Sequence, residues 1–576
     1  MGRQISLPFD RNVIITMNFL SQYWQLVKPF WLSKQRLPSI GLLLVIISMT
    51  FGSVWLSVQF NQWNGDFYNA LQQLDGSSIY RLLGQFILLI GSLILVRVYS
   101  SYLQKKLLID WRTWMTSQFT EKWLSDQNHH YHMKLAQTEP DNPDQRIAED
   151  IYLLIDLSLD LLLSFLRSVL TLGSFITILW GLSGEMSFKF ADQEWDIPGY
   201  MVWMCIAYTV FGTAITHWIG RPLQRLNFNQ QKREADFRAA LIERREHSEM
   251  IGAQRGESIE RQALSNKFTF VAENWYKLMV KERNLGFFTV GYAQISSLAP
   301  IFFALPQFLS GAIQLGGLMQ IKMAFMQVSS SLSWFIYSYR DLAKLSATVE
   351  RLTTFSNKIN DIKLSTGSEK PLGSSSLNAT LRVQLDDERP LLEVDNLTVN
   401  KGEIVILKGR SGLGKSSLLR TLSGFWPHYV GNFQSNESLW IPQKLYLTTA
   451  SLKALVCYPQ SEALFDDKTC ADVLEQVGLD SFIDSLNSVE PWASQLSGGE
   501  QQRLMFARLL INKPKLILLD ETTSSLDKHA AKQMIQTLKH ALPDSAVLMV
   551  SHQTELWAMA DSLIDLDTHQ PVTIGA

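Results

Sequence analysis

The stretch GRSGLGKS at 409–416 decides the fold of the C-terminal third of this chain. It follows the apolar run EIVILK (403–408), which is typical of a buried strand, and it leads into a helical pattern at 417–422. Glycines at this spacing let backbone N–H groups converge on phosphate oxygens at the start of a helix. The sequence therefore predicts a phosphate-binding loop. Its expected phosphate-contacting residues are Gly409, Arg410, Ser411, Gly412, Leu413, Gly414, Lys415, Ser416 and Ser417.

Two side chains of this loop and two acids further along the chain predict nucleotide hydrolysis. Lys415 is expected to neutralise the β- and γ-phosphates of ATP, and Ser416 to bind Mg²⁺. The run LILLDE (516–521) reads as a buried strand that ends in two acids. We expect Asp520 to hold the Mg²⁺ shell and Glu521 to polarise the attacking water.

A second anion-binding turn is expected at LSGGEQQR (496–503), which opens a helix. One nucleotide does not need two such turns from the same chain. The residues of this turn are therefore expected to contact ATP that is held by another copy of the chain. They are Ser497, Gly498, Gly499 and Glu500.

The composition indicates an apolar part joined to a soluble part. The chain has 576 residues, which favours at least two domains, and it is 46% hydrophobic but only 18% charged. Its mean hydropathy is close to zero, at +0.02. The formal net charge of -2 gives no support to nucleic-acid binding, and the three cysteines suit neither a disulfide framework nor a zinc site.

Six stretches are long and apolar enough to cross a bilayer, which needs about 20 residues. They are 37–60, 81–103, 158–181, 198–219, 286–309 and 317–340. The aromatic, amphipathic lead before the first of them is expected to form an elbow helix on the cytoplasmic face. Lys and Arg gather in 104–155 and 220–285 and are nearly absent from 61–80 and 182–197, which places both termini and the two long loops inside the cell.

Some residues within these spans have two readings that the sequence leaves open. Arg97 is best explained as snorkelling to the interface. Arg167, with Asp156 and Asp160 before it, either lines a cavity or lies on a helix that extends past the bilayer. The two prolines of the fifth span, at 300 and 306, predict either a gate or a passive kink.

The pattern also predicts where the domains divide. A polar stretch rich in Ser, Gly and Pro follows the last span and reads as a linker. The expected divisions are an N-terminal cytoplasmic segment at 1–36, a six-helix membrane domain at 37–345, a linker at 346–378 and an ATP-binding domain at 379–576.

These motifs resemble the nucleotide-binding domain of ABC transporters, and three more residues match that family's motifs. Gln443 matches the Q-loop, which implies a role at Mg²⁺ and in catalysis; Asp527 matches the D-loop; His552 matches the switch histidine at the γ-phosphate. One feature departs from the family. The region 382–390 lacks the aromatic residue that usually stacks on adenine, so Leu385 or a neighbour is expected to replace it.

The membrane half resembles SbmA/BacA permeases fused to an ATP-binding domain (the YddA-like group) and, more distantly, the peroxisomal fatty-acyl ABC transporters. The resemblance rests on five stretches: 61–71, 110–114, 141–150, 195–202 and 234–257. It implies an ABC exporter-like fold, in which an all-α polytopic membrane domain of six helices is joined to an α/β phosphate-loop NTPase domain. It also implies a bacterial inner-membrane location with the ATPase in the cytoplasm.

One phosphate loop and six spans per chain predict a half-transporter that acts as a homodimer through both domains, with ATP and Mg²⁺ as cofactors. The expected partner is a transported solute, hydrophilic or amphipathic, such as a peptide, a cobalamin-like compound or an acyl-CoA-like lipid, and not nucleic acid. A proton-coupled carrier with a regulatory ATPase is the alternative, because relatives without an ATPase are thought to be proton-driven. The direction of transport is left open.

Overall fold

The computed structural model describes residues 9–125, 129–135, 142–190, 193–365, 376–385, 389–435, 437–443, 445–567 and 570–572. The chain forms two compact units. One comprises Met1–Thr120 with Asn142–Phe355, and the other comprises Glu121–Asp141 with Ser356–Ala576. The first is almost entirely helical and the second is α/β, as expected. Of the expected linker, 346–365 is helical and 366–375 lies outside the described residues.

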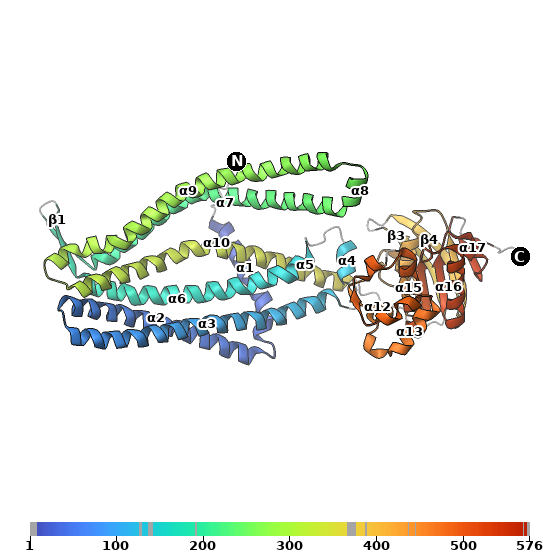
Figure 1. The fold of residues 1–576 in the computed structure, drawn as a ribbon, viewed down its shortest axis with the longest axis horizontal. Helices are drawn as coiled ribbons and strands as arrows, with labels where there is room; N and C mark the ends of the chain where they lie inside the picture. The colour runs from blue at the N-terminus through green and yellow to red at the C-terminus, as the bar shows by residue number, and fades with distance from the viewer. Residues whose placement is uncertain are drawn as a thin grey trace, which may run out of the picture. The chain divides into compact units, whose positions relative to one another are not determined.

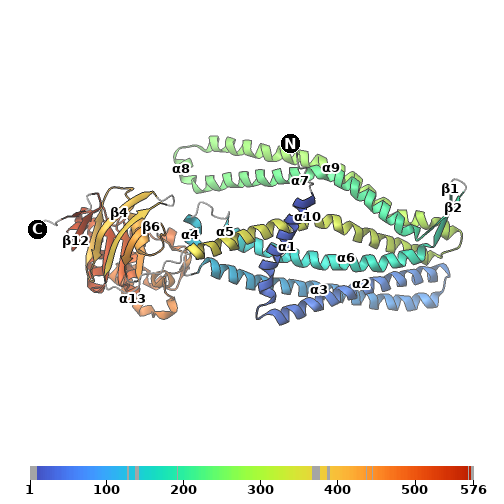
Figure 2. The same cartoon turned by 180° about the vertical axis from the view of Figure 1, so that it is seen from behind.

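Long helices make up the helical unit (Figures 1 and 2). They are α1 (Phe9–Trp31), α2 (Arg36–Gln72), α3 (Gly76–Trp123), α6 (Ile151–Ser183), α7 (Tyr200–Glu246), α9 (Glu257–Leu309) and α10 (Leu315–Ser365). Short elements connect them: α5 (Pro143–Gln145), a π-helix η1 (Arg146–Asp150), the hairpin of β1 (Glu185–Phe190) and β2 (Gln193–Pro198), and α8 (Ser248–Ala253). Helices α7 and α9 lie side by side and are joined through α8 (Figure 1).

Within the described residues, five helical segments are long and apolar enough to cross a membrane. They are Arg36–Gln72, Gly76–Trp123, Pro143–Ser183, Tyr200–Glu246 and Glu257–Leu309. Four of them contain an expected span, and Tyr200–Glu246 covers all but the first two residues of the expected span 198–219. The sixth expected span lies in α10, which is helical but falls outside this set, and its part described here carries Lys322 and the polar run Ser329–Ser331. Membrane crossing by α10 stays a prediction.

Side chains from α2 fix the start of α10. Asn69 Oδ1 accepts a hydrogen bond from Gly316 N at 2.8 Å, and Gln72 Oε1 accepts one from Leu315 N at 2.9 Å. The backbones approach so closely that a Cβ on Gly316 would lie 1.9 Å from Gly65 O. These side chains therefore satisfy N–H groups that a helix start otherwise leaves without partners. The stretch 61–71, noted for its resemblance, is a helix-packing surface here.

Ion pairs join the N-terminal end of α6 to the C-terminal part of α10. Asp150, at the end of η1, is buried and accepts hydrogen bonds from Arg146 and from Arg351, the latter through Nε at 2.9 Å and Nη2 at 2.6 Å. The open readings in the spans stay predictions: Asp160 and Arg167 are exposed in the single chain, and α9 continues through both prolines.

A six-stranded sheet forms the centre of the α/β unit. Its order is β13 (Gln570–Val572), β12 (Ser562–Asp565), β5 (Ile404–Lys408), β11 (Ala546–Val550), β10 (Leu516–Asp520) and β7 (Ser438–Ile441). All neighbours are parallel except β12 and β13. A three-stranded antiparallel sheet lies beside it: β4 (Pro390–Val399), β3 (Leu377–Gln384) and β6 (Tyr429–Gln434).

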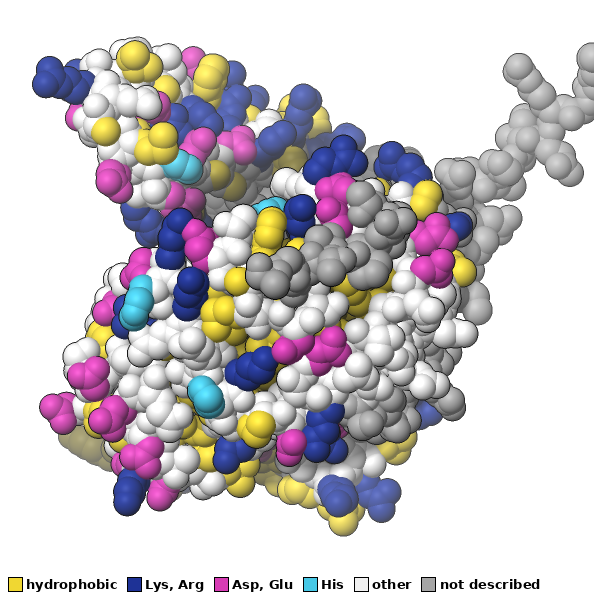
Figure 3. All heavy atoms as spheres, turned by 90° about the vertical axis from the view of Figure 1, so that its right-hand side faces the viewer, with side chains coloured by type: hydrophobic (Ala, Val, Ile, Leu, Met, Phe, Trp, Pro, Cys, Tyr) yellow, Lys and Arg dark blue, Asp and Glu magenta, His cyan; other side chains and the backbone are white. Residues whose placement is uncertain are grey.

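Helices complete this unit: α4 (His129–Leu135), α11 (Lys415–Leu422), α12 (Leu452–Cys457), α13 (Asp467–Gln476), α14 (Trp492–Gln495), α15 (Gly498–Asn512), α16 (Lys528–Ala541) and α17 (Thr554–Trp557). Two 3₁₀ turns, η2 (Glu462–Leu464) and η3 (Asp480–Ser485), and the strand pair β8 (Ala450–Ser451) and β9 (Val489–Glu490) lie among them. The surface shown in Figure 3 intersperses basic and acidic side chains.

The central sheet is buried on both faces, as parallel sheets require. Ile404 and Ile406 point into one apolar core with α12, α13, α15 and α16. Val405 and Leu407 point into the other, with α11 and the antiparallel sheet. The alternation along β5 thus explains why EIVILK is continuously apolar, and it fixes the phosphate loop at the end of a rigid strand.

Candidate functional site

Four neighbouring strands deliver the predicted site residues to one edge of the sheet. In the order β5, β11, β10, β7 the strands are parallel, so their carboxyl ends meet at the same edge. The phosphate loop follows β5, His552 follows β11, Asp520 and Glu521 end β10, and Gln443 follows β7. Ligands bind at this edge of open α/β sheets.

The phosphate loop has the backbone that its glycines predict. Gly412 and Gly414 have φ of 83° and 98°, where other residues are strained, and a Cβ on Gly414 would lie 2.7 Å from Leu391 Cγ. Lys415 is buried, and its Nζ donates to Gly409 O at 2.5 Å and to Arg410 O at 2.9 Å. The loop is thus curled around the lysine ammonium, and the Arg410 guanidinium pairs outward with Asp567 at 2.8 Å.

Glu521 is held by the residues expected to act with it. Gln443 Nε2 donates to Glu521 Oε2 at 2.9 Å, and His552 Nε2 lies 3.3 Å from Glu521 Oε1. The same His552 nitrogen lies 3.5 Å from Lys415 Nζ, so it serves one of these two partners at a time. The structure therefore brings Lys415, Gln443, Glu521 and His552 into one continuous cluster.

The expected Mg²⁺ ligands fit a hard divalent cation. Asp520 is only 4% exposed, and burial raises the pKa of its carboxyl while a hydrogen bond with Ser416 opposes that rise. Carboxylate, hydroxyl and amide oxygens are the donors that Mg²⁺ prefers. Ser416, Gln443 and Asp520 supply this donor set. The described residues hold no group of three His, Cys, Asp or Glu side chains suited to a metal ion. Phosphate oxygens of a bound nucleotide would complete the shell, because Mg²⁺ in ATPase sites is held by one or two carboxylates together with substrate phosphates.

The second anion-binding turn is capped by its own glutamate. Ser497 is the N-cap of α15; its Oγ accepts from Glu500 N at 3.4 Å, and its N donates to Glu500 Oε2 at 2.8 Å. Hydrogen bonds from Ser497 lower the pKa of Glu500. Ser497 and Gly498 are exposed, and within the described residues none of the hydrogen bonds of this turn runs to 409–417.

Asp527 lies at the N-terminus of α16. Its carboxylate accepts from His529 N and Ala530 N, each at 2.9 Å, and the bond from Ala530 is the largest cause that lowers its pKa. Gln502 on α15 joins the two segments, because its side chain donates to Ser524 Oγ at 3.2 Å and accepts from Ser525 N at 2.9 Å. The D-loop match is therefore tied to the helix of the second turn.

Where the adenine-stacking aromatic was missing, the end of β3 meets β6. Val383 pairs with Tyr429, and Gln384 N donates to His428 O at 2.9 Å. Leu385, the expected replacement, bonds through its N to Arg389 O at 2.9 Å. Aromatic side chains of the 426–429 segment therefore lie beside the end of β3, the region in which the family usually has the aromatic residue that stacks on adenine.

Sequence reasoning missed Arg508 on α15, which is 5% exposed. Its guanidinium donates to Leu455 O at 2.5 Å and to Tyr446 O at 3.2 Å, and it lies 5.1 Å from the centre of the Tyr458 ring. Burial lowers its pKa to about 10. No motif marks this residue; an arginine in the apolar stretch 504–511 was the available signal.

Both halves of the chain match known protein families. Residues 26–309 match the family described as "ABC transporter transmembrane region 2", and residues 392–524 match that described as "ABC transporter". The chain is 39% identical to the inner membrane ABC transporter ATP-binding protein YddA of Escherichia coli, over 98% of this chain and 99% of YddA. The chain belongs to the ABC transporter family.

Further relatives and a solved structure agree. This ABC transporter is 28% identical to "ABC transporter D family member 2, chloroplastic" of Arabidopsis thaliana (96% and 86% of the chains) and 24% identical to the human lysosomal cobalamin transporter ABCD4 (90% and 90%). Its fold matches a bacterial Atm1-family ABC exporter with a TM-score of 0.69 at 16% identity, over 94% of this chain and 96% of the other. It is a multi-pass inner-membrane protein whose ATPase activity is coupled to transport.

Proposed function

We propose that two copies of this chain form a transporter that moves a hydrophilic or amphipathic solute and is driven by ATP. Each of two ATP molecules would lie between residues 409–417 of one copy and 497–500 of the other. The observation that carries the proposal is the division of the site: Lys415, Gln443, Glu521 and His552 converge, while the exposed Ser497 turn makes its hydrogen bonds elsewhere. A second copy would supply the missing cradle.

The residues of the chain then have distinct tasks in hydrolysis. The loop N–H groups and Lys415 hold the phosphates and stabilise the charge that develops on them. Glu521 accepts a hydrogen bond from the attacking water, and Gln443 and His552 orient its carboxylate. Mg²⁺, held by Ser416, Gln443 and Asp520, would neutralise phosphate charge. The carboxylate of Glu500 has to release the N–H and hydroxyl of Ser497 when a phosphate of the partner's nucleotide arrives, since the two anions would compete for these donors.

Replacing Glu521 tests this mechanism. Glu521→Gln keeps the shape of the side chain but removes its ability to polarise water, so ATP should still bind while turnover falls by about two orders of magnitude or more. ATP hydrolysis by the purified full-length protein, together with its oligomeric state in ATP, measures both effects. ATP should trap the variant as a closed dimer. Unchanged ATPase activity would overturn the assignment of Glu521.

The energy source needs a separate measurement. Transport in sealed vesicles that contain ATP but lack a proton gradient supports the ATP-driven pump. Transport that needs only the gradient, and that survives Lys415→Ala, supports the proton-coupled carrier instead. The relatives named for cobalamin transport favour a solute of that size and polarity as the first candidate to assay. A screen for solutes that stimulate the ATPase would extend the choice to peptides and acyl-CoA-like lipids.

A further inference from the structure

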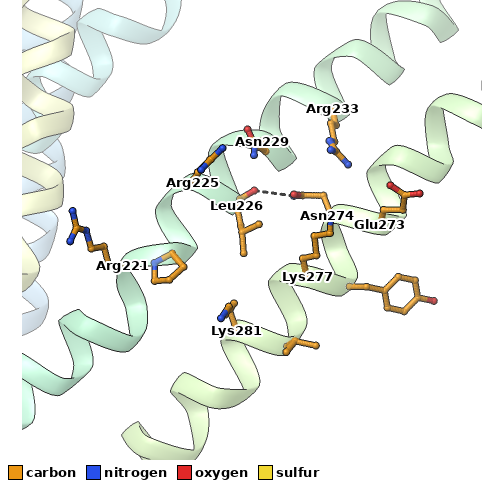
Figure 4. Close-up of a pocket in the computed structure, with 12 residues that line it drawn as sticks. Arg221, Arg225, Leu226, Asn229, Arg233, Glu273, Asn274, Lys277 and Lys281 are labelled. Atoms are coloured by element: carbon orange, nitrogen blue, oxygen red, sulfur yellow. Dashed lines mark hydrogen bonds between the residues drawn. The ribbon is translucent and has the colours of Figure 1, made fainter.

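A basic cleft of about 1420 Å³ lies between α7 and α9, and the residues that line it are separate in sequence from those of the ATP site (Figure 4). Five cationic side chains line it, and a single acid, Glu273, accompanies them. The cations are Arg221, Arg225, Arg233, Lys277 and Lys281. Apolar atoms of Pro222, Leu226 and Val280 form part of the same lining. The cleft thus combines a strong positive charge with an apolar surface.

The contacts between α7 and α9 show which cations of the two helices lie at the same level. Asn274, which is buried, donates to Leu226 O at 2.9 Å and to Gln230 Oε1 at 2.8 Å, and the atom nearest to a Cβ on Gly220 belongs to Leu285. Because α7 and α9 run antiparallel, Arg221 lies at about the level of Lys281. One turn further along, Arg225 lies at about the level of Lys277.

Like charges at one level of a helix pair repel each other unless an anion lies between them. In the described part of the chain, none of Arg221, Arg225, Lys277 and Lys281 forms an ion pair with a carboxylate. The fifth cation, Arg233, donates to Phe270 O. Glu273 lies about one turn before Lys277 on α9. It can neutralise at most one of these four cations, so at least three positive charges remain without a carboxylate partner. This arrangement favours an anionic occupant.

The height of the cleft indicates what that occupant is. The predicted spans end at 219 in α7 and begin at 286 in α9, so Arg221 and Lys281 lie about 3 and 8 Å below the hydrocarbon at 1.5 Å per residue. The polar headgroup layer of a leaflet is about 5–8 Å thick. The upper cations therefore lie at the depth of lipid phosphates, next to apolar side chains that suit the start of an acyl chain. Basic pockets between helices on the cytoplasmic side bind such headgroups.

We propose that the α7–α9 cleft binds the phosphate headgroup of an anionic phospholipid from the cytoplasmic leaflet. The lipid phosphate lies between the level of Arg221 and Lys281 and the level of Arg225 and Lys277. The bound lipid neutralises the repulsion between these cations and so stabilises the α7–α9 pair. This inference depends on the orientation of the helices in the membrane and not on the solute or the direction of transport.

Lipid binding to the purified, delipidated full-length protein in neutral detergent tests the proposal. The probes are short-chain phosphatidylglycerol, phosphatidylcholine and glycerol 3-phosphate, and the readout is the shift of the thermal unfolding midpoint with ligand concentration. Phosphatidylglycerol should give a saturable rise and phosphatidylcholine should not. Arg225→Gln combined with Lys277→Gln should weaken phosphatidylglycerol binding about thirtyfold.

Matched variants keep the result interpretable. Lys105→Gln with Lys106→Gln removes two exposed cations just below another predicted span and should leave the shift unchanged. Arg225→Lys with Lys277→Arg keeps the charge and should retain binding, even if the neutral pair folds poorly. An equal response to glycerol 3-phosphate would overturn the lipid assignment. An equal loss of the phosphatidylglycerol shift in the Lys105→Gln, Lys106→Gln control would also overturn it. If the Arg225→Gln, Lys277→Gln variant lost the dimer but still bound lipid, the cleft would instead be assigned to contact with a second copy.

Discussion

At the scale of single residues, Glu521 shows how the backbone prepares the site. Its φ is 50°, a left-handed conformation that costs a residue with a side chain about 1 kcal/mol or more. The bond from Glu521 N to Val550 O at 3.1 Å and the contacts from Gln443 and His552 hold this conformation. The strain turns the carboxylate out of the line of β10 and toward the phosphate loop, while Asp520 stays buried at the strand end.

The buried carboxylate of Asp520 predicts a conflict between stability and function. Burial raises its pKa, so at neutral pH the charged form disfavours the folded state. Asp520→Asn should therefore raise the unfolding midpoint of the metal-free protein, by about 2–4 °C for each kcal/mol gained. The same change should lower Mg²⁺-dependent ATP hydrolysis by about two orders of magnitude, because a metal ligand loses its charge.

The pH dependence of the unfolding midpoint shows whether the charge of Asp520 destabilises the fold. A carboxyl with a raised pKa stabilises the fold fully below its unfolded value of about 3.9 and loses that contribution as pH rises through the folded value. The advantage of Asp520→Asn should thus be present at neutral pH and vanish below about pH 4. A lower midpoint for the variant at pH 7 would contradict the burial argument.

At the scale of secondary-structure elements, α15 connects several motifs of the ATPase domain. Its first turn carries the exposed cradle, Gln502 holds Ser524 and Ser525 near the D-loop match, and Arg508 ties its far end to the segment after Gln443. One rigid helix therefore links three of the six motifs. We therefore expect a displacement of the segment after Gln443 to reach the Ser497 turn through these side chains.

Removing Arg508 should loosen this link. Arg508→Met leaves the carbonyls of Leu455 and Tyr446 without their donor, which should cost about 1–3 kcal/mol and lower the unfolding midpoint by several degrees. Arg508→Lys should not rescue the loss, because an ammonium lacks the planar fork that reaches both carbonyls. Thermal unfolding of the full-length variants measures both. Arg503→Met, on the same helix, removes one hydrogen bond to Gly478 O and should have the smaller effect.

Contacts that follow from motifs at strand ends could be predicted from the sequence, whereas contacts between residues far apart in the sequence could not. The phosphate loop 409–416, Asp520 and Glu521 were predicted from strand ends, whereas Gln443 and His552 were predicted only from the resemblance to the ABC family. All of them meet because parallel strands bring their carboxyl ends together. The bonds of Arg508 join residues 53 and 62 positions apart and leave no periodic signal. The sixth expected span lies in α10, which falls outside the set of described helices apolar enough to cross a membrane, and it buries polar residues such as Ser329, which bonds Thr209.

At the scale of the whole molecule, the proposed site is incomplete in one chain. The phosphate loop and the Ser497 turn each present N–H groups at a helix start, yet in the described residues their hydrogen bonds do not connect. Closed two-fold symmetry is the common way for identical chains to complete each other's sites. Two equivalent ATP sites then arise from a single sequence.

Mixing two defective variants tests this division. Lys415→Ala removes phosphate binding and Ser497→Arg blocks the cradle, so each should be inactive alone. In a mixed dimer, the loop of the Ser497→Arg copy meets the intact cradle of the Lys415→Ala copy. Equal co-expression should therefore restore about a quarter of the wild-type ATPase activity, because about half of the dimers are mixed and each keeps one intact site. No recovery would show that each chain uses its own cradle.

The cap that α2 provides for α10 limits how this transporter can open. Asn69 and Gln72 satisfy the first N–H groups of α10, and at Gly65 and Gly316 the two backbones touch. Parting the two helices there would leave the first N–H groups of α10 without their side-chain partners and would break the close contact between the two backbones. The pair should therefore travel as one body, and an outward-facing pathway has to form along a different seam. Cross-links between α2 and α10 should be tolerated during transport, whereas cross-links across the moving seam should stop it.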